Sequence, residues 1–207
     1  MLSRTVAIVS GGSSGLGAAT AKYLVRHGAK VVVADLEHQE AAFERMACSA
    51  MAFAATDVTN ADQVSSALDT AERVFGEPVN AVVNCAGVCP AKKTLSRKKG
   101  STDGPFAHPL DVFANTLHVN VVGSFNLNRL AAERMARREP DEKDGLRGCI
   151  INTASIAAYE GQMGQVAYAA SKAAIVGMTL PMARDLASYG IRVMTIVSEN
   201  RKCHMFG

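Results

Sequence analysis

Residues 5–17, Thr-Val-Ala-Ile-Val-Ser-Gly-Gly-Ser-Ser-Gly-Leu-Gly, decide the fold of this chain. Thr5–Ser10 is a short β-branched apolar run, which is typical of a buried parallel strand. The glycines that follow permit a tight turn, and residues 18–27 then show helical periodicity up to Gly28. In this arrangement the backbone and the helix N-terminus can approach a pyrophosphate closely. The stretch therefore predicts a dinucleotide-binding turn, although glycine-rich turns also occur without a ligand.

The rest of the chain alternates between strand and helix patterns. Further strands are predicted at 30–34, 50–56, 80–84, 149–153 and 191–197, with helices at 39–46, 61–75, 110–135 and 165–188. The 110–135 helix is expected in two pieces around Gly123, and the polar stretches 89–109 and 137–148 are expected to be surface loops. The alternation predicts a Rossmann-type α/β fold, in which a doubly wound parallel sheet lies between two helical layers (α/β/α). One domain over residues 1–207 accounts for the whole pattern.

Composition excludes several classes of protein. Apolar residues make up 48% and charged residues 20% of the 207 residues, which is a globular balance. A net charge of +3 argues against a nucleic-acid or membrane partner, and no apolar run is expected to reach the length of a bilayer span. The five cysteines form no C-x-x-C pair, so we expect neither a disulfide framework nor a metal site; they are Cys48, Cys85, Cys89, Cys149 and Cys203.

Asp35 follows the second predicted strand, 18 residues after Gly17. A carboxylate at this offset can accept hydrogen bonds from the adenosine ribose hydroxyls and would repel the 2′-phosphate of NADP. The alternative is that Asp35 only caps the helix that follows it. The offset from the glycines favours the ribose role, and the sequence therefore predicts NAD as the cofactor.

Further motifs follow the glycine turn in a fixed order. They are Gly11-x-x-x-Gly15-x-Gly17, Asp57-Val58, Asn84-Cys85-Ala86-Gly87, Asn120, Ser155, and Tyr168-Ala-Ala-Ser-Lys172. In this order and spacing they resemble the short-chain dehydrogenase/reductase family over Thr5–Ile196. The resemblance implies that the cofactor is held by Gly11, Ser13, Ser14, Gly15, Leu16, Gly17, Asp35, Asp57, Val58, Asn84, Cys85, Ala86, Gly87, Tyr168 and Lys172. It implies a catalytic tetrad of Asn120, Ser155, Tyr168 and Lys172, in which Asn120 keeps a helix open for a proton-relaying water.

Tyr168 and Lys172 are four residues apart and so share one face of a helix. An unperturbed tyrosine has a pKa near ~10, which is too high for an efficient base at neutral pH. A nearby ammonium group favours the phenolate, so Tyr168 can take a hydroxyl proton while hydride leaves the same carbon. Ser155 can hydrogen-bond the reacting oxygen. The alternative for such a pair is an ordinary exposed helix pair.

The substrate is indicated by the stretch from Ile151 to Ile196, which resembles the 3-hydroxyacyl-CoA dehydrogenase branch of the family. That resemblance implies hydride transfer between NAD and the 3-hydroxyl or 3-keto group of a short-chain acyl-CoA, with steroids or other secondary alcohols as further substrates. Ser155, Gln162, Gln165 and Tyr168 are its candidate substrate residues. A mitochondrial location follows from the same resemblance, but no presequence is visible, so a cytoplasmic location is the alternative.

The predicted loop 89–109 is strongly basic, with Lys92, Lys93, Arg97, Lys98 and Lys99. These groups could meet the phosphates of coenzyme A, or they could belong to a solvated loop with no ligand.

The last residues, 197–207, read VSENRKCHMFG and lack the Pro-Gly turn, substrate lid and seventh strand with which the family continues. We therefore expect a C-terminally shortened fold that assembles as a homo-oligomer, a dimer rather than the family tetramer. Two rival functions stay open. One is an NADPH-dependent ketoacyl-carrier-protein reductase, which Asp35 opposes. The other is a nucleotide-binding scaffold with little turnover.

Overall fold

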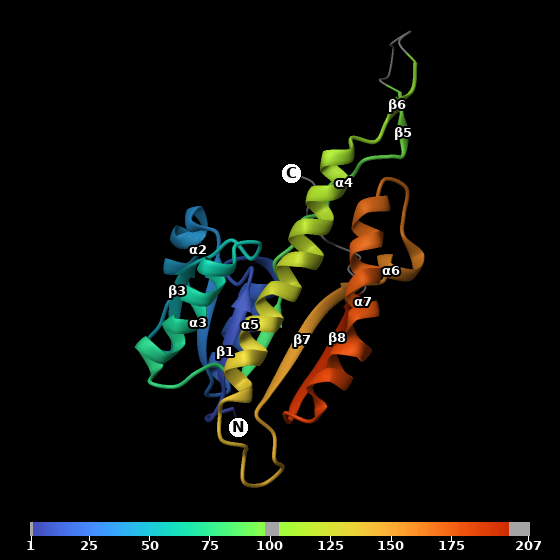
Figure 1. Cartoon of the computed structure of the whole chain (residues 1–207). Coiled ribbons are helices and arrows are strands. Elements are labelled where there is room, and N and C mark those ends of the chain that lie inside the picture. Colours follow the sequence, from blue (N-terminus) through green and yellow to red (C-terminus); the bar gives the residue numbers. More distant parts are fainter. Residues whose placement is uncertain (1, 98–103, 199–207) are drawn as a thin grey trace.

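A six-stranded parallel sheet in the order β3-β2-β1-β4-β7-β8 forms the centre of the molecule (Figure 1). This computed structural model describes residues 2–97 and 104–198. The strand order reverses between β1 and β4, and all six strands run parallel. This confirms the predicted doubly wound Rossmann-type sheet, whose ligands bind where the order reverses, at the carboxyl ends of the strands.

The strands lie close to their predicted positions. They are β1 Val6–Ser10, β2 Lys30–Asp35, β3 Met51–Ala55, β4 Ala81–Asn84, β7 Gly148–Ser155 and β8 Ile191–Ser198. The helices are α1 Gly15–Arg26, α2 Glu40–Glu44, α3 Ala61–Phe75, α4 Leu110–Leu117, α5 Ser124–Ala136, α6 Ala157–Glu160 and α7 Val166–Ala187, with a 3₁₀ turn at Glu37–Gln39. The first helix begins three residues earlier than predicted, and the second is shorter than predicted.

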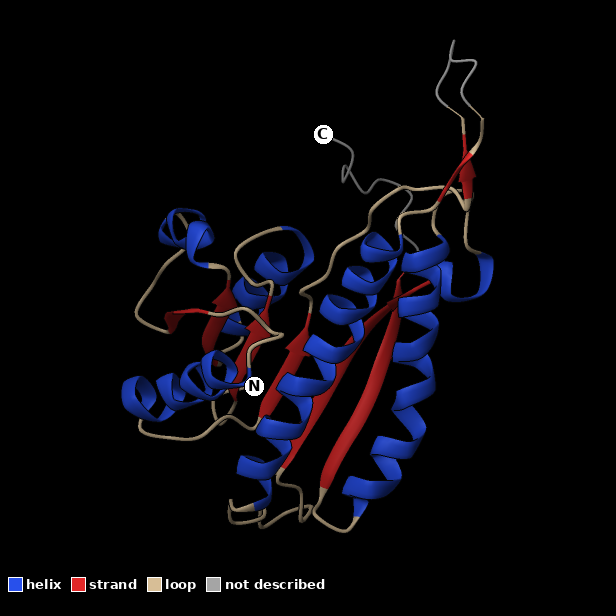
Figure 2. Cartoon of the chain, turned by 45° about the horizontal axis from the view of Figure 1, so that its top comes forward, coloured by secondary structure: helices blue, strands red, loops and turns tan. Residues whose placement is uncertain are grey.

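Two apolar cores lie on opposite faces of the sheet, because successive side chains of a strand point to opposite sides. Ile8 and Val32 point to the face covered by α3, α5 and α7. Ala7 and Val31 point to the face covered by α1 and α2. Figure 2 shows α5 and α7 running alongside the two long strands β7 and β8. The arrangement is the predicted α/β/α sandwich.

The helix that carries Asn120 was expected in two pieces around Gly123, and the structure has two α-helices there, α4 and α5. They are joined by a π-helical segment, His118–Gly123, so the chain stays helical between them. Gly123 keeps helical dihedral angles, and it is glycine for a packing reason: a Cβ there would lie 2.5 Å from Val58 Cγ2. A π-helical turn adds a residue to the helical repeat, which turns Asn120 inward; its side chain is 1% exposed.

Helix α7 corrects the expectation that no segment approaches the length of a membrane span. Its 22 residues are apolar enough to cross a membrane by length and composition alone. The same test is passed by core helices of soluble proteins. Helix α7 packs on β7, β8, α4 and α6, and its Lys172 ammonium donates a hydrogen bond to β7. We therefore describe α7 as a packed helix of the sandwich.

The basic loop forms a small β-hairpin that projects from the body (Figures 1 and 2). Its strands are β5 Leu95–Ser96 and β6 Phe106–Ala107. Lys92, Lys93 and Arg97 are exposed, as predicted for a surface loop, whereas Lys98 and Lys99 lie outside the described residues. A backbone hydrogen bond from Lys92 N to Gly164 O (2.9 Å) anchors the base of the hairpin on the loop before α7.

Candidate active site

Three of the predicted site residues end a parallel strand at the same edge of the sheet. Asp35 ends β2, Asn84 ends β4 and Ser155 ends β7, while the glycine turn follows β1 at Ser10. Because parallel strands end on the same side, residues that are far apart in sequence converge here.

The glycine-rich turn is shaped by close backbone contacts. A Cβ on Gly17 would lie 2.1 Å from Gly11 O, and a Cβ on Gly11 would lie 2.8 Å from Ala86 Cα. Gly15 has a φ of +50°, with nothing within 4 Å of its Cβ position, so it opens to the outside. Only glycine fits at positions 11 and 17, because a side chain at either position would clash with the backbone packed against it, that of Ala86 or of Gly11.

The same turn fits a dinucleotide such as NAD. Ser13 Oγ is buried and has no hydrogen-bond partner among the described residues, so it is available to a bound group. Ser14 caps α1 without a side-chain hydrogen bond, which leaves the backbone N–H groups of the first turn uncapped by that hydroxyl. Leu16 is 55% exposed beside them. Free N–H groups and the positive end of the helix dipole suit a pyrophosphate.

Asp35 has a structural role that the sequence did not reveal. Its Oδ2 accepts a hydrogen bond from Ser13 N (2.9 Å), and its Oδ1 accepts one from Leu36 N (2.9 Å). The carboxylate thus holds the glycine turn against the end of β2. A ribose ligand would share oxygens that already accept backbone N–H groups, which each oxygen can do because it has two lone pairs.

Asp57 and Val58 lie in the loop between β3 and α3. Asp57 Oδ1 accepts hydrogen bonds from Thr59 N (2.9 Å) and Thr59 Oγ1 (2.7 Å), which fixes the turn. Val58 is buried, and its carbonyl oxygen accepts a hydrogen bond from Asn126 Nδ2 of α5 (2.9 Å). These two predicted cofactor residues are therefore held in place by α5, the helix that follows the π-helical turn.

The turn Asn84–Gly87 is held by a hydroxyl outside the predicted set. Ser10 Oγ accepts hydrogen bonds from Cys85 N and Ala86 N, both at 3.3 Å. Asn84 Nδ2 donates to Asn128 Oδ1 (2.7 Å) and to Asn152 Oδ1 (2.9 Å) in the core. These contacts join four chain segments that sequence spacing could not relate, since they depend on strand register.

Cys85 is a half-buried thiol whose pKa is affected by the predicted catalytic lysine, Lys172. Burial raises the pKa of Cys85 to about 11, while the charge of Lys172 acts in the opposite direction. At neutral pH the group is therefore a protonated, weakly nucleophilic thiol. This protonation state argues against nucleophilic catalysis by Cys85.

Asn120 uses its whole side-chain amide inside the protein. Its Oδ1 accepts from Val88 N (2.8 Å), and its Nδ2 donates to Val88 O (2.9 Å) and to Ser171 Oγ (2.9 Å). The residue therefore ties the Asn84–Gly87 turn to α7. This geometry makes Asn120 a brace for the site; no substrate contact is required of it.

Tyr168 and Lys172 share one face of α7, as the spacing predicted. Lys172 Nζ lies 5.6 Å from the centre of the Tyr168 ring and donates a hydrogen bond to Thr153 O (2.8 Å). Thr153 precedes Ser155 by two residues on β7, so this bond fixes α7 beside the end of that strand. Ser155 Oγ accepts from Ala157 N (3.2 Å).

Lys172 is a buried residue, 7% exposed. Burial lowers the pKa of Lys172, and the thiols of Cys85 and Cys89 partly offset this effect. In its ammonium form Lys172, whose Nζ lies 5.6 Å from the centre of the Tyr168 ring, favours the Tyr168 phenolate.

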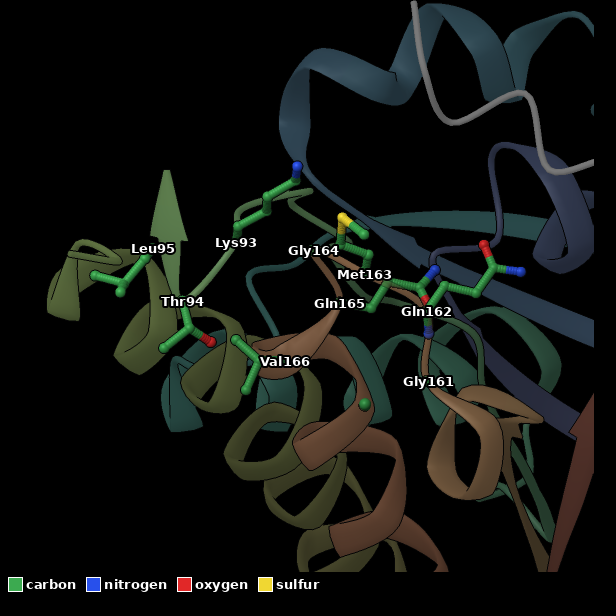
Figure 3. A pocket seen from close by; sticks show the side chains of 10 residues that line it. Lys93, Thr94, Leu95, Gly161, Gln162, Met163, Gly164, Gln165 and Val166 are labelled. Carbon is green, nitrogen blue, oxygen red and sulfur yellow. The ribbon is translucent and has the colours of Figure 1, made fainter. Parts of the chain in front are cut away.

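Gln162 and Gln165 line a pocket of about 500 Å³ between the base of the hairpin and α7 (Figure 3). Gln165 Oε1 accepts a hydrogen bond from Gln162 N (2.9 Å), so this amide shapes its own loop. Figure 3 shows Leu95 and Val166 together on one side of the pocket, whereas the Gln162 side chain points away from them. The wall also includes Lys93 and Ala169, the residue after Tyr168. The pocket thus reaches the first turn of the helix that bears Tyr168.

Comparison with known proteins settles the family. The model of the short-chain dehydrogenases matches residues 5–206. The chain belongs to the short-chain dehydrogenase family. Among the family's members it is 52% identical over 193 residues to a human 3-hydroxyacyl-CoA dehydrogenase type-2, covering 92% of this chain and 71% of that protein. The Drosophila melanogaster protein of the same name is 47% identical over 197 residues, covering 95% and 74%.

A solved structure shows the same similarity. The crystal structure of 3-hydroxyacyl-CoA dehydrogenase type-2 from Mycobacterium avium superimposes with a TM-score of 0.82 at 38% identity, covering 95% of this chain and 74% of that one. The chain is thus an oxidoreductase similar to these dehydrogenases, as its motifs predicted.

The packing of the glycine turn generates a prediction. Replacing Gly17 with Ala puts a Cβ into Gly11 O and must displace the turn, so NAD affinity should fall at least about tenfold. Calorimetric titration of NAD measures the loss. Gly177→Ala is the matched control, because that helical glycine has nothing within 4 Å of its Cβ position. Equal affinities in the Gly17→Ala variant and the unmodified chain would show that this contact does not shape the cofactor site.

Proposed function

We propose that this chain oxidises the 3-hydroxyl group of short-chain 3-hydroxyacyl-CoA with NAD, and catalyses the reverse reduction. The observation that carries the proposal is the pair on α7: Lys172 Nζ lies 5.6 Å from the Tyr168 ring centre and is held on β7 next to Ser155. The similarity to 3-hydroxyacyl-CoA dehydrogenases supports the choice of substrate. Steroids and other secondary alcohols are the further substrates of this proposal.

The residues divide the reaction between them. When NAD is bound, its nicotinamide ring supplies the hydride acceptor. Ser155 hydrogen-bonds the substrate hydroxyl, and Tyr168 accepts the hydroxyl proton as the carbon becomes a carbonyl. The Lys172 ammonium favours the phenolate form of Tyr168 before this transfer, since an opposite charge at this range stabilises the phenolate, and Tyr168 becomes a neutral phenol when it takes the proton. In the reduction, Tyr168 returns the proton to the carbonyl oxygen.

The coenzyme A part of the substrate finds suitable groups near the hairpin. Lys93 lines the pocket beside Tyr168's helix, and Lys92 and Arg97 are exposed on the same segment. Cations of this kind bind phosphates, and the pocket leads from them toward α7. Lys98 and Lys99 complete the basic segment outside the described residues.

Assembly and location belong to the same proposal. Val122 and Phe125, on the helix that carries Asn120, are exposed, as is Leu180 on α7. Apolar surface of this kind supports a homo-oligomer built on these two helices. The mitochondrial location rests on the family resemblance alone.

The first test concerns the cofactor. The unmodified chain should bind NAD more tightly than NADP, because Asp35 repels a 2′-phosphate. Asp35→Asn should narrow this preference by about tenfold, since it removes the charge while its amide oxygen can still accept from Ser13 N. Asp35→Ala should weaken the binding of both cofactors. Calorimetry on the three chains decides the matter, and tighter NADP binding by the unmodified chain would refute the assignment.

The second test concerns Tyr168. A panel of 3-hydroxyacyl-CoA thioesters, steroids and simple alcohols, assayed for NADH formation, should give the highest kcat/KM with a short-chain acyl-CoA. Tyr168→Phe should lower kcat at least about a hundredfold, since general acid–base catalysis contributes this much. Its NAD affinity should stay within about twofold of the unmodified chain. Retention of most activity would remove Tyr168 from the proton transfer.

The third test concerns the basic segment. Replacing both Lys92 and Lys93 with Ala should raise KM for acyl-CoA by about fivefold and leave KM for a steroid unchanged. The difference should shrink with added salt, which screens exposed charges. Lys143→Ala, in an exposed loop at the other end of β7, is the control. An equal change in KM for acyl-CoA and for the steroid would show that the segment does not bind phosphate.

A further inference from the structure

Ser171 lies within the Tyr-x-x-x-Lys motif but has no role in the mechanism above. It is fully buried on α7. Its Oγ donates a hydrogen bond to Tyr168 O (2.7 Å) and accepts one from Asn120 Nδ2 (2.9 Å). One hydroxyl thus connects the first turn of the catalytic helix to the π-helical turn.

The Asn120 side chain has no hydrogen-bonding group to spare for a different arrangement. The other two contacts of the amide go to the backbone of Val88, and the residue is 1% exposed. Without the Ser171 hydroxyl, one N–H of Asn120 would be buried with no acceptor. A buried unpaired donor is unfavourable, so the surrounding backbone would shift to pair it.

The Tyr168 side lies at the start of a helix. Helix α7 begins at Val166, and its N-cap, Gln165, makes no side-chain capping bond. Tyr168 is therefore in the first turn of the helix. The bond from Ser171 Oγ to Tyr168 O fixes the carbonyl group of this turn, and through Asn120 it links the turn to the π-helical segment. A small shift of this turn changes the distance between the Tyr168 ring and Lys172 Nζ.

We propose that Ser171 is a positioning residue that holds Tyr168 at its working distance from Lys172 by joining Asn120 to the first turn of α7. The proposal rests on the assignment of Tyr168 as the acid/base in the proposed function. Ser171 itself touches neither substrate nor cofactor in this role.

The direct test is Ser171→Ala. We expect kcat to fall between about tenfold and a hundredfold, the range expected when a reacting group is misplaced by a fraction of an ångström to an ångström. KM for NAD should change less than about twofold. The rising limb of the pH–rate profile should move to higher pH, because a weaker influence of Lys172 makes the Tyr168 phenolate harder to form.

Thr70→Ala is the matched control for loss of a buried helical hydroxyl. Thr70 is also buried, and its Oγ1 donates to Ser66 O (3.1 Å) in α3, away from the catalytic helix. Its removal should leave kcat and the pH profile unchanged. An unchanged kcat and pH profile in Ser171→Ala would overturn the proposal.

A double-mutant cycle separates positioning from general loosening. Asn120→Ala and Ser171→Ala remove the two ends of one bond, so the double variant should be no slower than the slower single variant. Multiplicative losses would show that the two residues act independently and would also overturn the proposal.

A measurement without turnover completes the test. The ultraviolet absorbance change on tyrosine ionisation, taken as the difference from Tyr168→Phe, isolates one of the four tyrosines of the chain. With NAD present, Ser171→Ala should raise the apparent pKa of this tyrosine; an unchanged value refutes the positioning role.

If Tyr168→Phe itself stays active, the proposed function fails. If Tyr168→Phe is inactive while Ser171→Ala behaves normally, only the present inference fails.

Discussion

The contact between two turns, the glycine turn after β1 and the Asn84–Gly87 turn after β4, is the constraint on which the site depends. Gly11 packs directly against Ala86, and the Ser10 hydroxyl accepts the N–H groups of Cys85 and Ala86. The two strands are neighbours where the strand order reverses. Because the two turns pack against each other, the N-terminus of α1 and the ends of the strands face the same region of the sheet edge. Cofactor and substrate groups can therefore meet in that region.

Buried polar contacts extend this constraint from the turns to the catalytic helix. Asn120 binds the backbone of Val88 beyond the second turn and reaches Ser171 on α7. Lys172 in turn binds the backbone of β7 at Thr153. Each of these groups is paired in a region with little water, where a missing partner would be unfavourable. The reacting face of α7 is therefore positioned by side chains that take no part in the reaction.

The sequence predicted the bounds of an element well where a capping or helix-ending residue marks each end of it. Helix α3 runs from Ala61 to Phe75 as predicted, because Asn60 caps its N-terminus and Gly76 adopts the left-handed conformation at its end. The π-helical turn was missed, because a glycine in an apolar helix suggests a break, and its packing reason, Val58, is remote in sequence. The candidate site residues could be named from motifs, but the roles of Ser10 and Ser171 depend on strand register and helix packing.

The hairpin β5–β6 is attached at its base by a backbone bond, Lys92 N to Gly164 O. Gly164 there has a φ of +87°, and a Cβ on it would still lie 3.7 Å from Lys92 N. The anchorage therefore depends on main-chain atoms and one glycine, and not on the Lys92 side chain. A substitution at Leu95 on β5 therefore changes one wall of the pocket, while the anchoring bond and the residues on α7 and β7 keep their main-chain attachments.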